Sequence, residues 1–207
     1  MAETDPWITD VDRLKAIYGE VGAASMKKET AFVHPHYRKL IEASPFAVLA
    51  TSCPEGLDAS PRGDGPGFVV VEDEHTLLMP DRRGNNRIDS LLNVVRDPRV
   101  ALLFLLPGLG ETLRVNGKAR ISVDQALIAR FEMEGKLPRS VLVIRVEAVY
   151  FQCARAIIRS KLWDPAQHID KSQLPSMGTI LADLTDCEIE AESYDRELPD
   201  RQRSTLY

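Results

Sequence analysis

The sequence predicts a mainly β protein with flanking helices, in which antiparallel strands form a closed or nearly closed barrel. Short segments rich in Val, Ile, Leu and Phe fill the middle of the chain, and turn residues separate them. Single helical segments interrupt these strands without the regular alternation of a doubly wound sheet. With 207 residues, 44% of them hydrophobic, the chain is long enough to bury a core without disulfides or structural metal.

The amino-terminal part of the chain predicts two helices. Asp10–Tyr18 has apolar residues at helical spacing, and a second helical segment covers Tyr37–Glu42. We therefore expect residues 1–45 to form a helical arm.

The period changes to that of strands after this arm. Phe46–Ser52 predicts a strand, Pro54-Glu55-Gly56 a turn and Leu57–Pro61 the returning strand of a hairpin. The further expected strands are Phe68–Glu72, Thr76–Met79, Val100–Leu106, Thr112–Ser122 and Val141–Phe151.

Three helices are expected between or after these strands, at Asn86–Val95, Val123–Met133 and Ala154–Leu162. One strand contains conflicting signals, because Asn116-Gly117 is typical of a two-residue hairpin turn. The alternative is one long strand bent by a glycine bulge, and local rules do not choose between the two.

The barrel is expected to span residues 46–163, with residues 164–207 packed on it as a loop, a short helix and a tail. Periodicity is lost after Trp163, and the segment contains Pro165, Pro175 and Pro199. We expect a loop over Asp164–Met177, a helix over Gly178–Thr185 and at most partial order beyond.

Charge and composition exclude several classes of protein. The formal charge of −5 favours neither nucleic acid nor an anionic membrane as a partner, and the longest apolar run, Val100–Leu106, is far shorter than the about 20 residues that span a bilayer. The amino terminus lacks a secretory signal, which predicts a cytoplasmic protein. Cys53, Cys153 and Cys187 form no close-spaced pair, so no metal site is expected.

Two polar segments predict a local anion site in this acidic chain. DASPRGDGPG places Ser60 and Arg62 at the end of an expected strand. PDRRGNNRIDS gathers arginine and asparagine side chains around Gly84, at the start of an expected helix whose free N–H groups favour anions. Guanidinium groups bind phosphate bidentately, so a phosphate site is one interpretation. The alternative is solvated arginines with an asparagine helix cap.

The order of the motifs resembles a known family. FAVLATSCPEGLDASPRGDGPGFV, LLMPDRRGNNRIDSLLNVVRDPRVALLFLLPG, ETLRVNGKARI and AVYFQCARAIIRSKLWDP follow one another as in the pyridoxamine 5'-phosphate oxidase-like, FMN-binding split-barrel family. The likeness covers about Phe32 to Pro165 and is greatest to the uncharacterised FMN-dependent branch. It implies an FMN-binding split β-barrel, antiparallel and Greek-key-like, and a long bent strand through Asn116-Gly117.

The resemblance also implies a set of FMN-binding residues. The strand after the first hairpin matches at Ser60, Pro61 and Arg62, and the strand-to-helix turn, which binds the phosphate in the family, matches at Arg82, Arg83, Asn86 and Arg87. Backbone along the flavin edge matches Met79 and Pro80. The strand at the family's dimer interface matches Thr112 and Arg114, and the segment after the last strand matches Arg159, Lys161 and Trp163.

The implied function is that of a homodimeric FMN-dependent oxidoreductase, with FMN between the subunits and hydride transfer through flavin N5 to or from a small-molecule substrate. The vitamin B6 oxidases carry an Arg-x-His pair after the last strand, whereas this chain has Arg155-Ala156-Ile157. Pyridoxamine phosphate oxidation is therefore not expected. The alternative is a non-catalytic protein that binds flavin, deazaflavin or haem as a sensor or carrier.

Overall fold

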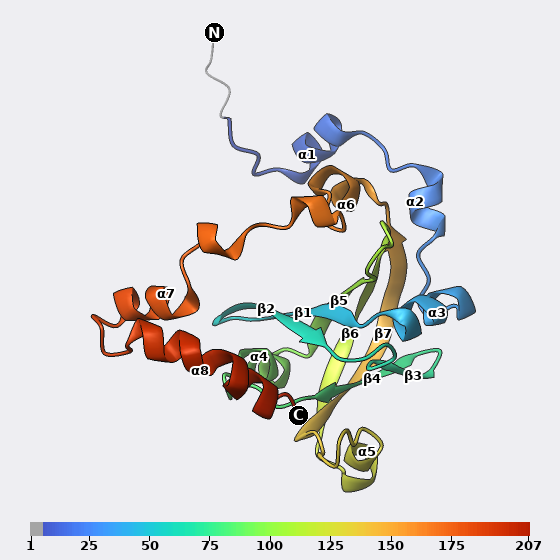
Figure 1. Ribbon diagram of the computed structural model, residues 1–207. Coiled ribbons are helices and arrows are strands. Elements are labelled where there is room, and N and C mark those ends of the chain that lie inside the picture. The colour runs from blue at the N-terminus through green and yellow to red at the C-terminus, as the bar shows by residue number, and fades with distance from the viewer. Residues whose placement is uncertain (1–5) are drawn as a thin grey trace.

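A computed structural model describes residues 6–207 and contains one seven-stranded antiparallel sheet with flanking helices (Figure 1). The strand order is β2-β1-β5-β6-β7-β4-β3. The strands are β1 Phe46–Cys53, β2 Gly56–Gly63, β3 Val70–Asp73, β4 Thr76–Asp81, β5 Arg99–Leu105, β6 Thr112–Ser122 and β7 Ser140–Gln152. This confirms the predicted fold class, and each strand lies within about two residues of its expected position.

The sheet curls around a main hydrophobic core, and its strands alternate between buried and exposed residues. A second, smaller cluster contains Leu78, Ile128, Phe131 and Val141. In β1, Ala47 and Leu49 are fully buried, and in β5 Leu102 and Phe104 are at most 1% exposed. Side chains from β6 and β7 close the interior, and Ile41 from the helix before β1 covers one end. β2 is different, because none of its residues is buried. This edge strand therefore presents its polar side chains outside the core.

β6 is one continuous strand, so the structure decides against a hairpin turn at Asn116-Gly117. The register between β6 and β7 shifts between these two residues, which is a β-bulge. A Cβ on Gly117 would collide with the carbonyl oxygen of Arg145 on β7. Glycine is needed here because the two backbones approach so closely.

Helices precede, interrupt and follow the strands and flank the sheet (Figure 1). Up to residue 163 they are α1 Val11–Tyr18, α2 Ala23–Lys27, α3 Pro35–Ala43, α4 Asp89–Arg96, α5 Gln125–Ala129 and α6 Arg155–Ser160. α5 is shorter than the helix expected over Val123–Met133, because Glu134 and Gly135 take positive φ angles and an isolated bridge joins Met133 to Lys136. Among residues 6–207 no helix is long and apolar enough to cross a bilayer.

Residues 164–207 form what we call the C-terminal arm. It contains two 3-10 turns, Pro165–Gln167 and Lys171–Gln173, followed by α7 Met177–Leu184 and α8 Ala191–Ser204. The expectation that the tail has at most partial order is wrong, since α8 is the longest helix described. Its start is capped by Glu190, whose carboxylate accepts hydrogen bonds from the N–H groups of Glu192 and Ser193. The polar composition of the segment and Pro199 concealed this helix.

Candidate anion-binding site

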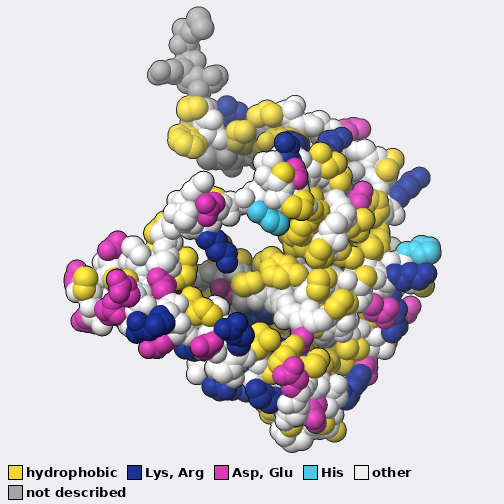
Figure 2. Space-filling view, in the orientation of Figure 1, with side chains coloured by type: hydrophobic (Ala, Val, Ile, Leu, Met, Phe, Trp, Pro, Cys, Tyr) yellow, Lys and Arg dark blue, Asp and Glu magenta, His cyan; other side chains and the backbone are white. Residues whose placement is uncertain are grey.

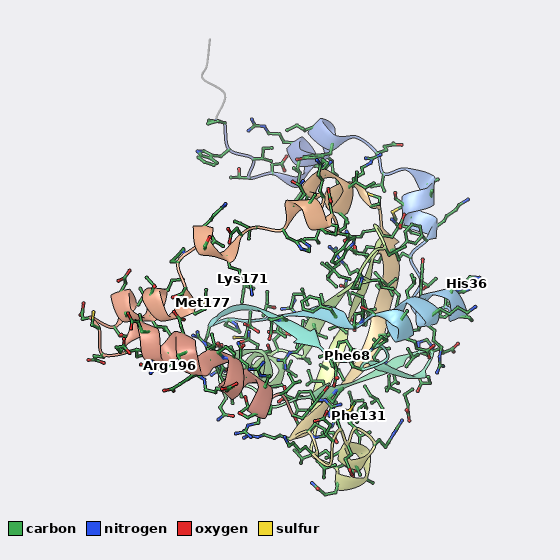
Figure 3. The ribbon with its side chains drawn as sticks, viewed as in Figure 1. His36, Phe68, Phe131, Lys171, Met177 and Arg196 are labelled. Atoms are coloured by element: carbon green, nitrogen blue, oxygen red, sulfur yellow. The ribbon has the colours of Figure 1, made fainter. Side chains whose placement is uncertain are left out.

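A cavity of about 580 Å³ lies beside the ends of β2 and β4, where the chain passes into α4. Its walls include three short segments: β2 and the residues that follow it, the end of β4 with the loop to α4, and the start of β7. The end of the C-terminal arm, Leu206 and Tyr207, supplies a fourth wall. Phe68, which is labelled in Figure 3, is an apolar lining residue.

Arg62, a lining residue on β2, forms hydrogen bonds with β4 and with α4. Its Nη1 donates to Asp81 Oδ1 at 2.7 Å, and its Nη2 donates to Ser90 Oγ at 3.3 Å. Ser90 in turn donates to Asp58 on β2. The Nε of Arg62 is buried and has no hydrogen-bond acceptor within the described part of the chain. A buried donor without a partner costs about 1 to 3 kcal/mol.

Arg82 also lines the cavity and is held by two acceptors. Its Nε donates to Asp64 Oδ2 at 2.9 Å, and its Nη1 donates to the carbonyl oxygen of Phe131 at 2.5 Å. The Asp64 side chain is only 3% exposed. Burial alone would raise the pKa of Asp64, but hydrogen bonds from Gly65 N–H and the Tyr207 hydroxyl, together with Arg82, hold that pKa below its ordinary value. Asp64 is therefore a carboxylate that fixes Arg82 and has no proton to donate.

The loop between β4 and α4 forms the rim of the cavity. Asn86 has a φ of 62°, and its Oδ1 accepts a hydrogen bond from Arg139 Nη1 at 2.8 Å. The Oδ1 of Asn85 accepts from the backbone N–H of Arg87 at 3.0 Å. α4 itself begins at the rim without a side-chain cap, as helix starts that bind anions often do.

The charge of the lining favours an anion. The five lining arginines outnumber the two lining aspartates, although the chain as a whole is acidic. The arginines are Arg62, Arg82, Arg83, Arg87 and Arg139. Apolar surface from Phe68, Ile88 and Leu91 adjoins these guanidinium groups. Such a site can bind an organic phosphate or carboxylate by charge-assisted hydrogen bonds and cover its apolar part.

Eight of the residues implied by the family resemblance lie together around this cavity: Ser60, Pro61, Arg62, Pro80, Arg82, Arg83, Asn86 and Arg87. Met79 is fully buried in the core beside them, with its side chain directed away from the cavity. The anion-site interpretation of the two polar segments thus agrees with where the structure places their side chains.

The other five implied residues lie elsewhere. Thr112 and Arg114 occupy the start of β6, where Arg114 Nη1 donates to the Tyr150 hydroxyl at 3.0 Å. The cavity adjoins the opposite end of the same strand pair, because Ser122 pairs with Val141 next to the lining residue Ser140. The eleven residues of β6 separate the two ends by about 33 Å.

The segment that follows β7 lies close to the start of β6 and far from the cavity. Trp163 Nε1 donates to the carbonyl oxygen of Leu109 at 2.8 Å, which fixes this segment to the turn before β6. Arg159 is in the last turn of α6 and Lys161 follows it with a φ of 51°. Within one chain, these residues cannot line the cavity.

Sequence reasoning missed several cavity residues. Asp64 lies inside the motif that drew attention to Arg62, so its pairing with an arginine could have been anticipated from charge alone. Arg139, Leu206 and Tyr207 had no local signal. They reach the cavity through the tertiary fold, and Tyr207 does so from the far end of the chain.

Comparisons with known proteins agree with the fold. A family model described as pyridoxamine 5'-phosphate oxidase matches residues 33–153, more than half of the chain. A search of curated proteins found no match.

Solved structures that are similar to this chain include HupZ from Group A Streptococcus, at 20% identity and a TM-score of 0.46, covering 56% of this chain and 90% of HupZ. General stress protein 26 from Bacillus anthracis shares 18% identity, with a TM-score of 0.42, 55% of this chain and 88% of that protein covered. A related protein from Clostridium acetobutylicum, of the pyridoxinephosphate oxidase family, shares 11% identity, with a TM-score of 0.44 and coverages of 57% and 86%.

Proposed function

Because the chain belongs to the pyridoxamine 5'-phosphate oxidase family, we propose that its arginine-lined cavity binds FMN and that the protein is an FMN-dependent oxidoreductase acting on a small molecule. The observation that carries this proposal is the lining of the cavity, in which five arginines outnumber two aspartates although the chain as a whole is acidic. Guanidinium groups bind phosphate oxygens by charge-assisted hydrogen bonds.

The donor set fits the phosphate of FMN. Arg62 and Arg82 are each anchored by a carboxylate, so their guanidinium groups are already oriented before a ligand binds. Arg83 and Arg87 are exposed on the rim and add charge. Preorganised donors lose little conformational entropy on binding, which raises affinity for an anion.

FMN, when bound, would supply hydride transfer at its N5 atom. The chain's own residues bind and orient the cofactor. The described lining of the cavity contains no His, Lys, Cys or Glu, and Asp64 and Asp81 are each paired with an arginine. The protein's role is therefore binding, orientation and positive charge, and proton exchange falls to the substrate and solvent.

We propose further that the protein is a homodimer in which the second copy completes each flavin site. Thr112, Arg114, Arg159, Lys161 and Trp163 are about one strand length away from the cavity of their own chain. They can contribute to a flavin site only in a neighbouring copy. The exposed edge strand β2 leaves room for such a neighbour.

Mixing two defective variants tests this arrangement. Arg62→Ala and Arg159→Ala damage opposite halves of the proposed shared site. In a mixed dimer, one pocket carries both substitutions and the other carries neither, so refolded mixtures should bind FMN better than either variant alone. Equal binding by the mixture and the separate variants would refute shared pockets.

The cofactor itself is tested by the visible absorption spectrum of the purified protein, with mass identification of any released ligand. We expect FMN at about one per chain, and steady NAD(P)H consumption by the loaded protein. Colourless protein that does not take up FMN would refute the assignment. A Soret band would indicate haem, and bound FMN without turnover would support a carrier or sensor instead of an enzyme.

Arg62→Lys tests one of the lining guanidinium groups. Lysine keeps the charge beside Asp81 but removes the planar fork, so FMN affinity should fall about tenfold, the equivalent of one charge-assisted hydrogen bond. The matched control is Arg99→Lys, since Arg99 on β5 also pairs with an aspartate, Asp97, but does not line the cavity. Equal FMN affinity in Arg62→Lys and Arg99→Lys would remove Arg62 from the site.

A further inference from the structure

The C-terminal arm is joined to the barrel at its two ends. It leaves the barrel after Trp163, and α7 and α8 lie beside the sheet as a separate pair of helices (Figures 1 and 2). Contacts between this helix pair and the barrel strands are marginal. Among the described residues from 165 to 207, one hydrogen bond reaches the barrel, from the Tyr207 hydroxyl to Asp64 Oδ1 at 2.8 Å.

The two helices of the pair approach each other closely at Gly178. Gly178 N–H donates to Asp195 Oδ1 at 2.8 Å, and a Cβ on Gly178 would collide with the carbonyl oxygen of Ala191. Met177 and Arg196, labelled in Figure 3, mark α7 and α8. The pair can therefore move as one unit when its contact with the barrel is released.

Tyr207 makes its contact inside the cavity, with both partners of the Asp64–Arg82 pair. Its hydroxyl shares Asp64 Oδ1 with the N–H of Gly65, which donates at 2.8 Å. The guanidinium carbon of Arg82 lies 5.5 Å from the centre of the Tyr207 ring, within range of a cation–π interaction. One side chain of the arm thus restrains both the buried carboxylate and the arginine that Asp64 orients.

We propose that Tyr207 is a positioning residue of the ligand site: it holds Arg82 in its binding orientation and closes the cavity over a phosphate-bearing ligand, so that docking of the arm sets how long the ligand stays bound. This inference rests on the proposed function for the identity of that ligand, FMN. The cavity keeps a volume of about 580 Å³ with Tyr207 as a wall. Tyr207 therefore bounds the space without filling it.

Dissociation rates of FMN separate this role from a merely structural one. After rapid dilution of the loaded protein to a concentration far below its Kd for FMN, the released FMN is followed by its fluorescence. Tyr207→Phe keeps the ring over Arg82 and loses the hydrogen bond to Asp64, so dissociation should be about threefold faster. Tyr207→Ala loses both contacts, so dissociation should be about tenfold faster or more. Unchanged or slower dissociation from Tyr207→Ala would overturn the proposal.

Tyr194 provides the matched control. It also stacks with an arginine, since the Arg201 guanidinium lies 4.5 Å from its ring, but it belongs to α8 and does not line the cavity. Tyr194→Phe should release FMN at the wild-type rate. Acceleration in Tyr194→Phe equal to that in Tyr207→Phe would mean that the arm's general stability, and not the contact at Asp64, controls release.

A measurement without FMN distinguishes failure of this inference from failure of the proposed function. Trypsin cleavage after Arg203, close to the docked end of α8, should be faster in Tyr207→Ala than in the wild type. If the wild-type protein takes up no FMN, the proposed function fails. Inorganic phosphate then replaces FMN as the probe: it should slow this cleavage in the wild type and not in Tyr207→Ala, and equal protection in both would overturn the role of Tyr207.

Discussion

The barrel and the C-terminal arm keep their shapes by different means. The barrel surrounds a continuous core to which every strand except β2 contributes buried side chains, whereas α7 and α8 bury only Gly178 between them. The arm reaches the barrel through polar contacts of Tyr207. The burial of many apolar side chains stabilises the barrel collectively, because the hydrophobic effect is non-directional. The few hydrogen bonds of the arm can each be broken separately. The barrel is therefore suited to hold a site, and the arm to respond to what the site contains.

The largest difference between the two regions should come from removing buried apolar volume. Phe104→Ala empties a fully buried position and should lower the free energy of unfolding by about 3 to 5 kcal/mol. Leu184→Ala changes a side chain on the arm that is 78% exposed and should stay within about 0.5 kcal/mol. Urea denaturation measures both. A similar loss for the two variants would show that the arm is covered by a partner in solution.

Two glycines provide a sharper version of the same comparison. Gly117→Ala forces a Cβ against Arg145 within the sheet and should destabilise the barrel by about 1 to 3 kcal/mol, the usual cost of overpacking. Gly178→Ala forces the same kind of collision between α7 and α8. It should increase trypsin cleavage in the arm and leave the barrel's urea midpoint unchanged. A lowered barrel midpoint in Gly178→Ala would contradict the independence of the two regions.

Within the cavity, an exposed arginine contrasts with the buried one. Arg87 is 79% exposed and pairs with Asp89. Arg87→Ala should weaken FMN binding about tenfold, the lower end of the range for a charge-assisted hydrogen bond, because solvent screens a rim charge. Fluorescence titration with FMN checks this value. Unchanged affinity would exclude Arg87 from the site while leaving Arg62 in it.

The smallest expected effect is a change in titration. The hydrogen bond to Asp64 raises the pKa of Tyr207 above its ordinary value of 10.0, with burial and the Asp64 charge adding to the shift. The contact therefore contributes fully below pH 10.0 and is lost as the pH rises through the raised pKa. The phenolate absorbance of the wild type minus that of Tyr207→Phe should show one tyrosine titrating above 10.0. A difference curve centred at or below 10.0 would mean that the contact is absent in solution.

At acid pH the same contact depends on Asp64, whose pKa is lowered by folding, whereas that of Tyr207 is raised. Because the folded protein lowers the pKa of Asp64 from 3.8, its carboxylate contributes fully above that value and loses its contribution as the pH falls through the lowered pKa. The contribution of this contact to docking of the arm should therefore be constant between pH 3.8 and pH 10.0. Hydrogen exchange in the last turn of α8, compared between wild type and Tyr207→Phe across the acid range, tests it. If the wild type lost protection near neutral pH, the ionisation of Asp64 would not be the cause of the pH dependence.

Where sequence reasoning succeeded, the signal was periodic or local. A short apolar run, Phe46–Ala50, bounded by the turn residues Pro54 and Gly56, identifies β1. The structure then buries Ala47 and Leu49 on its inner face. Ser60, Arg62 and the loop around Gly84 were visible as polar motifs at strand and helix ends. Where it failed, the cause was tertiary. α8 has no apolar stripe and contains Pro199, and its order depends on Glu190 and on packing against Gly178.

The sequence by itself determined the antiparallel strands, the acidic overall charge and the concentration of arginine beside Gly84, because pattern, composition and local motifs are properties of neighbouring residues. Only the tertiary structure decided that β6 continues through Asn116-Gly117, that Arg62 Nε is buried without an acceptor, and that Tyr207 reaches Asp64 from 143 residues away. Each of these depends on which backbones and side chains meet in space. Such meetings are set by the packing of the whole chain, and no local pattern records them.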